Sequence, residues 1–312
     1  MRRSQALAAL AAVPAIGVPV AIRAQSTAPI RIGVVVADTY AAGLYASDAG
    51  FFTRAGLDVD VRIFPGSGAV AVAAAGNALD VGLTDAVVLS NAVNRGVPLV
   101  AIAGSGLYGP GQATAFVCVR RDAPYKTAKD FEGQAFAVVT LVSISSTAVK
   151  TWLARNGADL AKIRFIEMPF SEMAAAMMRG TVAGAFLAEP ALSQAPPEIV
   201  ILADAYAAIA RSFLISNWFT TRDWLARNPE VARRLVATIE LAARWANQHH
   251  DLTEPMLVKY AKLDPEKVHA MRRCPYAVTP IQPAMLQPVI DAAVRLNAID
   301  RPVNAADLIA RV

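Results

Sequence analysis

Short apolar runs alternate with segments of helical pattern between Gly50 and Gly104. Two helical segments separate three apolar runs, which lie at residues 57–64, 80–83 and 97–103. Strands that alternate with helices in this way form a parallel sheet with helices on both faces. This part of the chain is therefore expected to fold as an open α/β sheet, whose ligand crevice lies at the carboxyl ends of the strands.

The same pattern starts earlier in the chain and is repeated later. Residues 30–36 (IRIGVVV) are a continuous β-branched run, as expected of a buried parallel strand, and a single helix is expected at 40–55. Glycines from Gly104 onward interrupt the pattern, and a second α/β set occupies residues 114–202. A last apolar run precedes a helical tail that begins at Asp223. The sequence thus predicts two doubly wound α/β lobes, a two-segment hinge between them, and a helical C-terminal tail that packs on the first lobe.

Residues 1–25 have the pattern of a cleavable signal peptide for export. Arg2 and Arg3 precede an uncharged apolar run, and the small residue Ala24 suits the position before a cleavage site. The run is short and contains prolines, which argues against a membrane span, although an uncleaved anchor is the alternative interpretation. Export from the cytoplasm is therefore expected.

The charge of the chain gives little support for a nucleic-acid partner. Residues 1–25 hold three arginines and no acidic residue, so that the net charge falls from +5 to +2 when they are removed. The remaining basic residues are scattered, without a cluster of five or more. No nucleic acid is expected among the partners.

The sequence offers no convincing catalytic, cofactor or metal site. Residues 104–109 match G-x-G-x-x-G, but a strand-like run follows where a dinucleotide site needs a helix. All three histidines lie in the helical tail. His250 and Glu254 are four residues apart, as metal ligands on one helix face can be, but a solvated helix end is the favoured interpretation of this pair. Cys118 and Cys274 are expected to be two separately buried thiols. We therefore expect no catalysis, no cofactor and no metal.

Hydroxyl, glycine and acidic residues gather where strands of the expected sheets end. Each such segment offers backbone N–H groups and side-chain oxygens at a helix N-terminus, which either cap the helix or contact a ligand. Because several of these ends converge in an open sheet, they are the candidate ligand-binding residues. They are Asp38, Thr39, Tyr40, Gly66, Ser67, Thr84, Asp85, Ser143, Ser145, Ser146 and Glu189.

The order and spacing of several segments resemble a known family. The segments are GFFTRAGLDVDV, ALDVGLTDAVVLSNAVNRGVPLVAIAG, DFEGQAFAV and the stretch from WLARNGADL to FLAEPALSQA. In these segments the chain resembles the periplasmic solute-binding proteins of ABC importers. The similarity is to the nitrate/sulfonate/taurine branch, which also includes binding proteins for pyrimidine precursors of thiamine.

This resemblance implies a type 2 periplasmic binding fold in which two lobes close on a solute and dock on an inner-membrane permease. It implies a first lobe of residues 26–106 and 219–312, a second lobe of residues 107–218, and a monomer. Asn217 and Trp218, at the second crossing between the lobes, are added to the candidate ligand-binding residues.

The expected solute is a small organic molecule, either sulfonate-like or a heterocyclic or amine-bearing compound. Asp38, Asp85 and Glu189 are candidate pocket residues, and the first-lobe pocket segments contain no arginine or lysine. Three unpaired carboxylates would repel a simple oxyanion. Two alternative functions remain open at this point: a pyrimidine-precursor synthase-like enzyme on the same fold, and a periplasmic partner of a receptor kinase.

Overall fold

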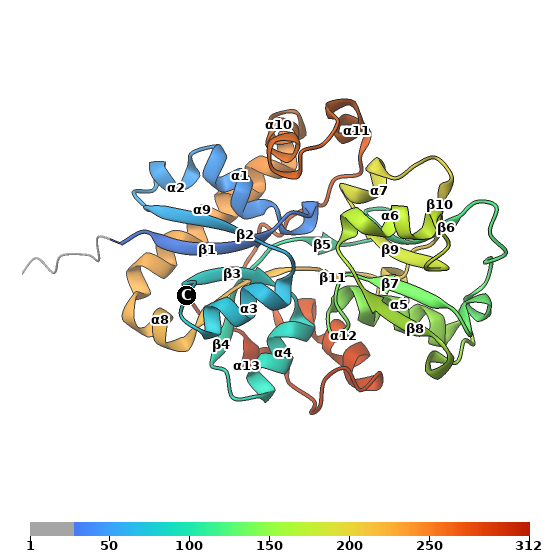
Figure 1. The fold of residues 1–312 in the computed structure, drawn as a ribbon. Helices are drawn as coiled ribbons and strands as arrows, with labels where there is room; N and C mark the ends of the chain where they lie inside the picture. Colours follow the sequence, from blue (N-terminus) through green and yellow to red (C-terminus); the bar gives the residue numbers. More distant parts are fainter. Residues whose placement is uncertain (1–27) are drawn as a thin grey trace, which may run out of the picture.

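In the computed structural model, which describes residues 28–312, two sheets lie beside each other and helices cover both (Figure 1). The expected signal peptide lies outside the described residues. The part of the chain around the first sheet is called the first lobe below, and the part around the second sheet is called the second lobe. This arrangement confirms the predicted α/β fold.

The first sheet has the order β2-β1-β3-β12-β4. Strands β1, β2 and β3 are parallel, whereas β12, from the distant second crossing, is antiparallel to both of its neighbours. The strands are β1 (Ile30–Val35), β2 (Val59–Phe64), β3 (Val81–Thr84), β4 (Leu99–Gly104) and β12 (Asn217–Thr221).

Helices cover both faces of the first sheet. One face packs against α1 (Ala42–Asp48) and, from the C-terminal tail, α9 (Pro229–Gln248), and the other against α3 (Ser67–Ala75) and α4 (Ala86–Asn94). The single helix expected at 40–55 is three pieces: the 3₁₀ turn η1 (Asp38–Tyr40), α1, and α2 (Phe51–Arg54). The break before α2 falls at Gly50, whose φ of 72° lies in the left-handed region that favours glycine.

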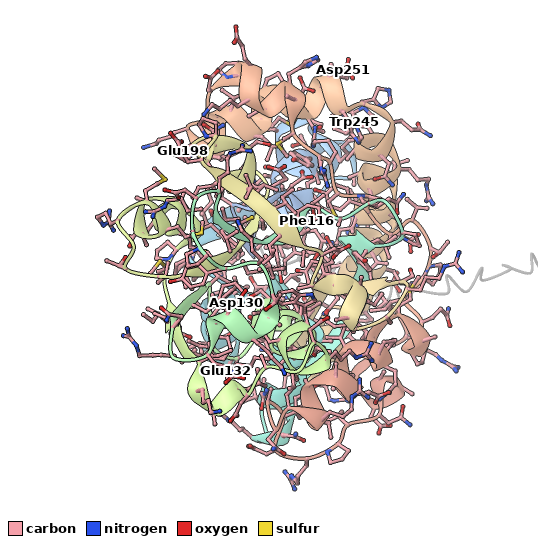
Figure 2. All side chains as sticks on the ribbon, turned by 90° about the vertical axis from the view of Figure 1, so that its right-hand side faces the viewer. Phe116, Asp130, Glu132, Glu198, Trp245 and Asp251 are labelled. Atoms are coloured by element: carbon pink, nitrogen blue, oxygen red, sulfur yellow. The ribbon has the colours of Figure 1, made fainter. Side chains whose placement is uncertain are left out.

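The second sheet has the order β10-β6-β9-β7-β8. Strands β7, β8 and β9 are parallel, and β6 is antiparallel to both β9 and β10. Phe116 lies inside this lobe, and the exposed Asp130 and Glu198 lie on its outer surface (Figure 2). Its strands and helices are β6 (Ala115–Arg120), η2 (Ala128–Phe131), β7 (Ala135–Val138), α5 (Ile144–Arg155), η3 (Leu160–Lys162), β8 (Arg164–Glu167), α6 (Phe170–Met178), β9 (Gly184–Ala188), α7 (Ala191–Gln194), β10 (Ile199–Ala203) and η4 (Tyr206–Ala208).

The lobes are joined by a small antiparallel ribbon of β5 (Leu107–Tyr108) and β11 (Phe213–Leu214). A third segment, from the C-terminal tail, lies along this ribbon. The Leu107 amide donates to the Pro275 carbonyl at 2.8 Å, and the Ala277 amide donates to the Ser105 carbonyl at 2.8 Å. The hinge therefore has one segment more than the two that the sequence predicts, because the tail returns through it.

The C-terminal tail packs mainly on the first lobe, as expected, through α8 (Arg222–Arg227), α9, α10 (His250–Ala261) and α13 (Ala305–Leu308). Two tail helices also reach the second lobe. Helix α11 (Pro265–Ala270) contacts α7, and α12 (Pro283–Arg295) contacts both α4 and α5 (Figure 1). The tail thus contacts both lobes beside the hinge.

Gly82 in β3 allows a close approach that a larger residue would prevent. A Cβ at this position would lie 2.4 Å from Val70 Cγ1 and 2.8 Å from Phe219 Cε1. We expect Gly82→Ala to lower the free energy of unfolding by about 1–3 kcal/mol through overpacking. Gly68→Ala in α3 is the control, because no atom of residues 28–312 outside its own helix and chain neighbours lies within 4 Å of its Cβ position. Equal unfolding midpoints for the two variants would contradict this account of the core.

Candidate functional site

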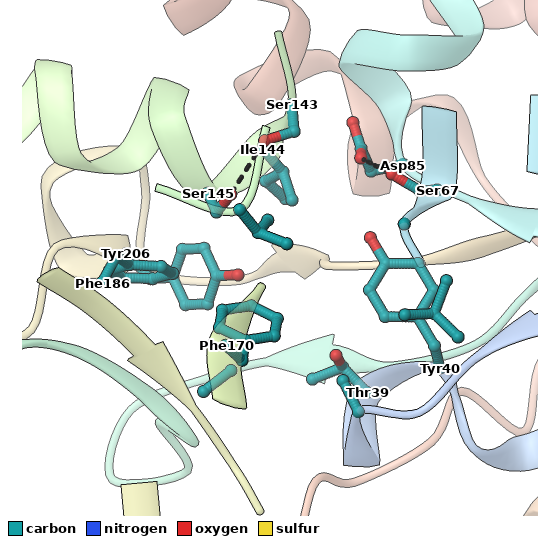
Figure 3. A pocket seen from close by; sticks show the side chains of 15 residues that line it. Thr39, Tyr40, Ser67, Asp85, Ser143, Ile144, Ser145, Phe170, Phe186 and Tyr206 are labelled. Carbon is teal, nitrogen blue, oxygen red and sulfur yellow. Dashed lines mark hydrogen bonds between the residues drawn. The ribbon is translucent and has the colours of Figure 1, made fainter. Parts of the chain in front are cut away.

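A cavity of about 30 Å³ lies between the two lobes, and both lobes line it (Figure 3). This volume is far below the roughly 300–1,000 Å³ of typical ligand pockets. Beside the cavity the two lobes approach closely, because Thr140 Cγ2 lies 3.6 Å from the Cβ position of Gly66. Residues from the first lobe are Val35, Ala37, Thr39, Tyr40, Gly66, Ser67 and Asp85. Those from the second lobe are Val139, Ser143, Ile144, Ser145, Phe170, Phe186, Ala188 and Tyr206.

The first-lobe wall is built from the ends of β1, β2 and β3. Asp85 caps α4 and accepts hydrogen bonds from the amides of Val87 and Val88 at 3.0 and 3.1 Å. The Ser67 hydroxyl donates to the same carboxylate at 2.9 Å and so joins the starts of α3 and α4. Tyr40 lies beside this pair (Figure 3). These contacts hold a carboxylate and hydroxyl groups at the carboxyl end of the sheet.

The second-lobe wall combines the N-terminus of α5 with aromatic rings. The Ser143 hydroxyl caps α5 and lies 2.8 Å from the Ser145 hydroxyl. The Tyr206 ring packs edge-on against Phe186, with ring centroids 5.3 Å apart, and its hydroxyl points toward the opposite wall (Figure 3). The cavity therefore presents polar groups together with flat apolar surfaces, which suits a small organic ring system.

The electrostatic character of the cavity is set by one acid. Asp85 is completely buried, and burial raises the pKa of its carboxyl group to about 6. The hydrogen bonds that the carboxylate accepts lower this pKa, but by less than burial raises it. Burial also raises the pKa of the Tyr40 hydroxyl, and the Asp85 carboxylate beside it raises this pKa further. No lysine or arginine is among the described residues that line the cavity. The walls therefore favour uncharged or hydrogen-donating groups over anions.

The Asp85 pKa gives a pH-dependent stability. An acid whose pKa is higher in the folded chain binds more protons there than in the unfolded chain, so that stability falls as the pH rises from about 4 to about 6. The shift corresponds to about 3 kcal/mol above that window. We expect Asp85→Asn, which keeps a capping oxygen, to gain most of this energy above pH 6 and nothing below pH 4. The free energy of unfolding is measured for variant and parent at several pH values from 4 to 8. A difference between the two that does not change with pH would contradict the raised pKa of Asp85.

Seven of the candidate residues named from the sequence line the cavity together: Thr39, Tyr40, Gly66, Ser67, Asp85, Ser143 and Ser145. The other six do not line it: Asp38, Thr84, Ser146, Glu189, Asn217 and Trp218. Their side chains contact other parts of the molecule.

Asp38 belongs to a buried network behind the cavity wall. Its carboxylate lies 3.4 Å from Arg273 Nη2 and accepts hydrogen bonds from the Tyr45 hydroxyl at 2.8 Å and from the Cys274 amide at 2.6 Å. The Tyr276 hydroxyl donates to the Asp38 carbonyl. The network connects the 3₁₀ turn that carries Thr39 and Tyr40 to the tail segment in the hinge.

Glu189 and Ser146 are satisfied within their own segments. The Glu189 carboxylate accepts from the amide and hydroxyl of Ser193, both at 3.0 Å, at the start of α7. Ser146 donates to the Leu141 carbonyl at 2.9 Å. The argument from three unpaired carboxylates facing a solute is thus wrong for Asp38 and Glu189, because both have partners elsewhere. Only Asp85 lines the cavity.

Thr84, Asn217 and Trp218 are completely buried in the first sheet. Trp218 points to the face that carries α1, where its ring fills the space beside Gly43. Thr84 and Asn217 are cross-strand neighbours on the opposite face. Their side-chain polar atoms have no hydrogen-bond partner among the described residues.

Sequence reasoning missed the aromatic part of the cavity. Phe170 begins α6, Phe186 lies within β9, and Tyr206 lies in the short turn η4. Phe170 follows the end of β8 and could have been found by the strand-end rule that found Ser143. Tyr206 lies outside any strong strand or helix pattern, and no local signal marks it.

The described residues contain no cluster of three or more side chains suited to hold a metal ion, and no helix among them is long and apolar enough to cross a membrane. Cys118 and Cys274 are both buried and not joined to each other, as the sequence interpretation favoured. His269 pairs with Glu254 at 3.1 Å. Residues 104–109 run from β4 into β5, without the helix that a dinucleotide site needs.

A family model described as "NMT1/THI5 like" matches residues 38–252, which is more than half of the chain. The chain therefore belongs to the NMT1/THI5-like family. The matched region includes the whole cavity except Val35 and Ala37. A comparison with curated protein sequences gave no significant match.

Solved structures with a similar fold are mostly binding proteins. The aliphatic sulphonate binding protein SsuA from Escherichia coli shares 18% identity, with 91% of this chain and 92% of that chain covered and a TM-score of 0.74. SsuA from Xanthomonas axonopodis pv. citri bound to MOPS shares 17%, with 93% and 100% covered and a TM-score of 0.79. The desulfurization enzyme DSZB shares 14%, with 91% and 96% covered and a TM-score of 0.68. The resemblance to periplasmic binding proteins in fold is confirmed.

Proposed function

We propose that this protein is an exported receptor that captures a small organic solute between its lobes and delivers it to an ABC import permease. The observation that carries the proposal is the cavity, which both lobes line with aromatic rings and a few oriented polar groups. Its place between two hinged α/β lobes is where a closing receptor holds its ligand. The binding proteins among the similar folds support this assignment.

The proposal includes the cell location and the partner. The signal pattern of residues 1–25 supports export to the periplasm, where a closed, loaded receptor would dock as a monomer on a membrane permease. The moving units proposed are residues 26–106 with 219–312, and residues 107–218. One adjustment to these bounds follows from the sheet: Asn217 and Trp218 fall within 107–218 but pair with the first sheet, so that both would move with the first unit.

We further propose that the chain does not transform its solute. Neither cysteine lines the cavity, and burial raises the pKa of both thiols, which disfavours the reactive thiolate. None of the three histidines lines it either. Because an enzyme is also among the similar folds, the alternative function is catalysis on the bound solute. The experiment below distinguishes the receptor from the enzyme.

The test is to recover the solute and see whether it is changed. The mature chain, produced in a bacterial periplasm, is expected to carry a small molecule that native mass spectrometry detects and that is released chemically intact. Returned at about 100 times its Kd, that molecule should stabilise the chain by about 2.7 kcal/mol in thermal unfolding. Conversion of the bound molecule into a product would contradict the receptor and favour the enzyme.

A further inference from the structure

Three polar atoms lie buried beside the cavity without a partner. They are Thr84 Oγ1 and both amide atoms of Asn217, and none has a hydrogen bond within the part of the chain that the structure describes. Both residues are completely inaccessible to solvent. A buried polar atom left unpaired costs about 1–3 kcal/mol, so that two such residues side by side call for an explanation.

The register of the first sheet places these atoms in one row with the cavity wall. Gly33 in β1 is paired with Gly82 in β3, the last pair between these two strands, so that Val35 and Thr84, each two residues further on, lie on the same face of the sheet. Thr84 is in turn paired with Asn217 in β12. Residues paired across strands share a face of the sheet, and neighbouring strands lie about 4.8 Å apart. Val35 lines the cavity, and from its strand the row continues to Thr84 on β3 and then to Asn217 on β12.

Apolar groups lie on two other sides of this row. Gly82 lies two residues before Thr84 on the same face of β3. Val70 and Phe219 pack against it, and their nearest atoms would lie 2.4 and 2.8 Å from a Cβ at that position. Beyond Asn217 in the row comes Gly104, where a Cβ would lie 2.8 Å from the Cβ of Ala277. The amide of Asn217 therefore borders hydrocarbon on these two sides. Thr84, its partner in the row, directly precedes the cavity residue Asp85 in the chain.

We propose that the solute cavity continues along this row when a ligand is bound, and that Thr84 and Asn217 form its inner polar end, which binds the amide group of an uncharged ring compound. The inference rests on the proposed receptor function and adds the class of solute to it. Asn217 offers one acceptor and two donors, and Thr84 offers a hydroxyl that does both. An amide pairs all of these atoms at once.

Charged groups of similar size fit this end less well. A sulfonate accepts hydrogen bonds but donates none, so that the Asn217 oxygen would stay unpaired, and it would lie near the Asp85 carboxylate. An amidinium donates but does not accept, so that the Asn217 nitrogen would stay unpaired. A site built to pair both kinds of group rejects analogues that lack one of them, because its buried atoms are then left without partners.

The test uses three probes that share one ring: benzamide, benzamidine and benzenesulfonate. We expect calorimetric titration of the mature chain to give benzamide the lowest Kd. Asn217→Leu and Thr84→Val should weaken benzamide binding at least tenfold, while their thermal midpoints stay level or rise because unpaired polar atoms are removed. Thr238→Val on α9 is the control, because its hydroxyl donates to the Arg234 carbonyl far from the cavity, and it should leave binding unchanged.

Other results would overturn the inference without touching the receptor function. If benzenesulfonate bound more tightly than benzamide, and Asn217→Leu did not change its Kd, the inner end of the cavity would not be an amide-binding site. Benzamide binding that is insensitive to both variants would mean that ordered water satisfies these atoms. Failure of benzamide to bind at millimolar concentration would also overturn it. Failure of the receptor itself would appear differently, as a solute that is converted or as a chain that carries none.

Discussion

Arg273→Met should lower the free energy of unfolding by about 3–5 kcal/mol, because it leaves the buried Asp38 carboxylate without its counter-charge. The Arg273 side chain is only 8% exposed and that of Asp38 is completely buried. The guanidinium also donates to the Tyr45 and Thr253 hydroxyls at 3.1 and 2.8 Å. Its loss would therefore loosen the contact between α1, α10 and the tail segment in the hinge. Equilibrium unfolding in guanidinium chloride measures the change in the free energy of unfolding.

A matched surface pair is the control for this prediction. Arg233 and Glu230 form an ion pair on α9 at 2.6 Å, but their side chains are 56% and 71% exposed. Arg233→Met should therefore change stability by about 0.5 kcal/mol or less. The double variant Asp38→Asn with Arg273→Met should recover part of the loss, since no buried charge remains. If Arg273→Met were as stable as the surface control, the network would not hold the hinge.

Gly66→Trp should abolish solute binding, with a loss of at least 100-fold, and leave the two lobes folded. Gly66 lies on the first-lobe wall with extended backbone, at φ −171°, which any residue adopts. In the part of the chain that the structure describes, the Cβ position of Gly66 meets Thr140 Cγ2 of the second lobe, at 3.6 Å. An indole there would occupy the space into which the second lobe closes, so that binding would be lost through blocked closure.

Gly66→Ala is the control, because a Cβ at 3.6 Å from Thr140 makes an ordinary van der Waals contact. Its affinity for the solute released from the native chain should stay within about threefold of the parent by titration calorimetry, under 0.7 kcal/mol. Unimpaired binding by Gly66→Trp, with an unchanged thermal midpoint, would mean that the solute does not bind between closed lobes.

The strands and their order of appearance could be predicted well, because buried parallel strands leave a strong local signal. The run at 30–36 became β1 (Ile30–Val35) and the run at 57–64 became β2 (Val59–Phe64). The broken helix around Gly50 was not predicted, since its apolar pattern continues across the break. A left-handed glycine inside a helical pattern has the same sequence signal as a helix-end glycine.

The candidate site could be predicted where it depends on strand ends and not where it depends on distant partners. Ser67, Asp85 and Ser143 follow from the rule that strand ends face the crevice. The partner of Asp38, Arg273, lies 235 positions further along the chain, and no local pattern connects the two. A sequence shows where a carboxylate is but not which distant residue pairs with it. For this reason the argument that Asp38 would repel an anionic solute was wrong.

Small-angle X-ray scattering of the mature chain, with and without the solute released from it, tests the central claim most directly. The account predicts a smaller radius of gyration with the solute than without it, as the lobes close around it, and no such change in Gly66→Trp. The same radius of gyration in both states of the parent chain, at solute concentrations that saturate calorimetric binding, would contradict it.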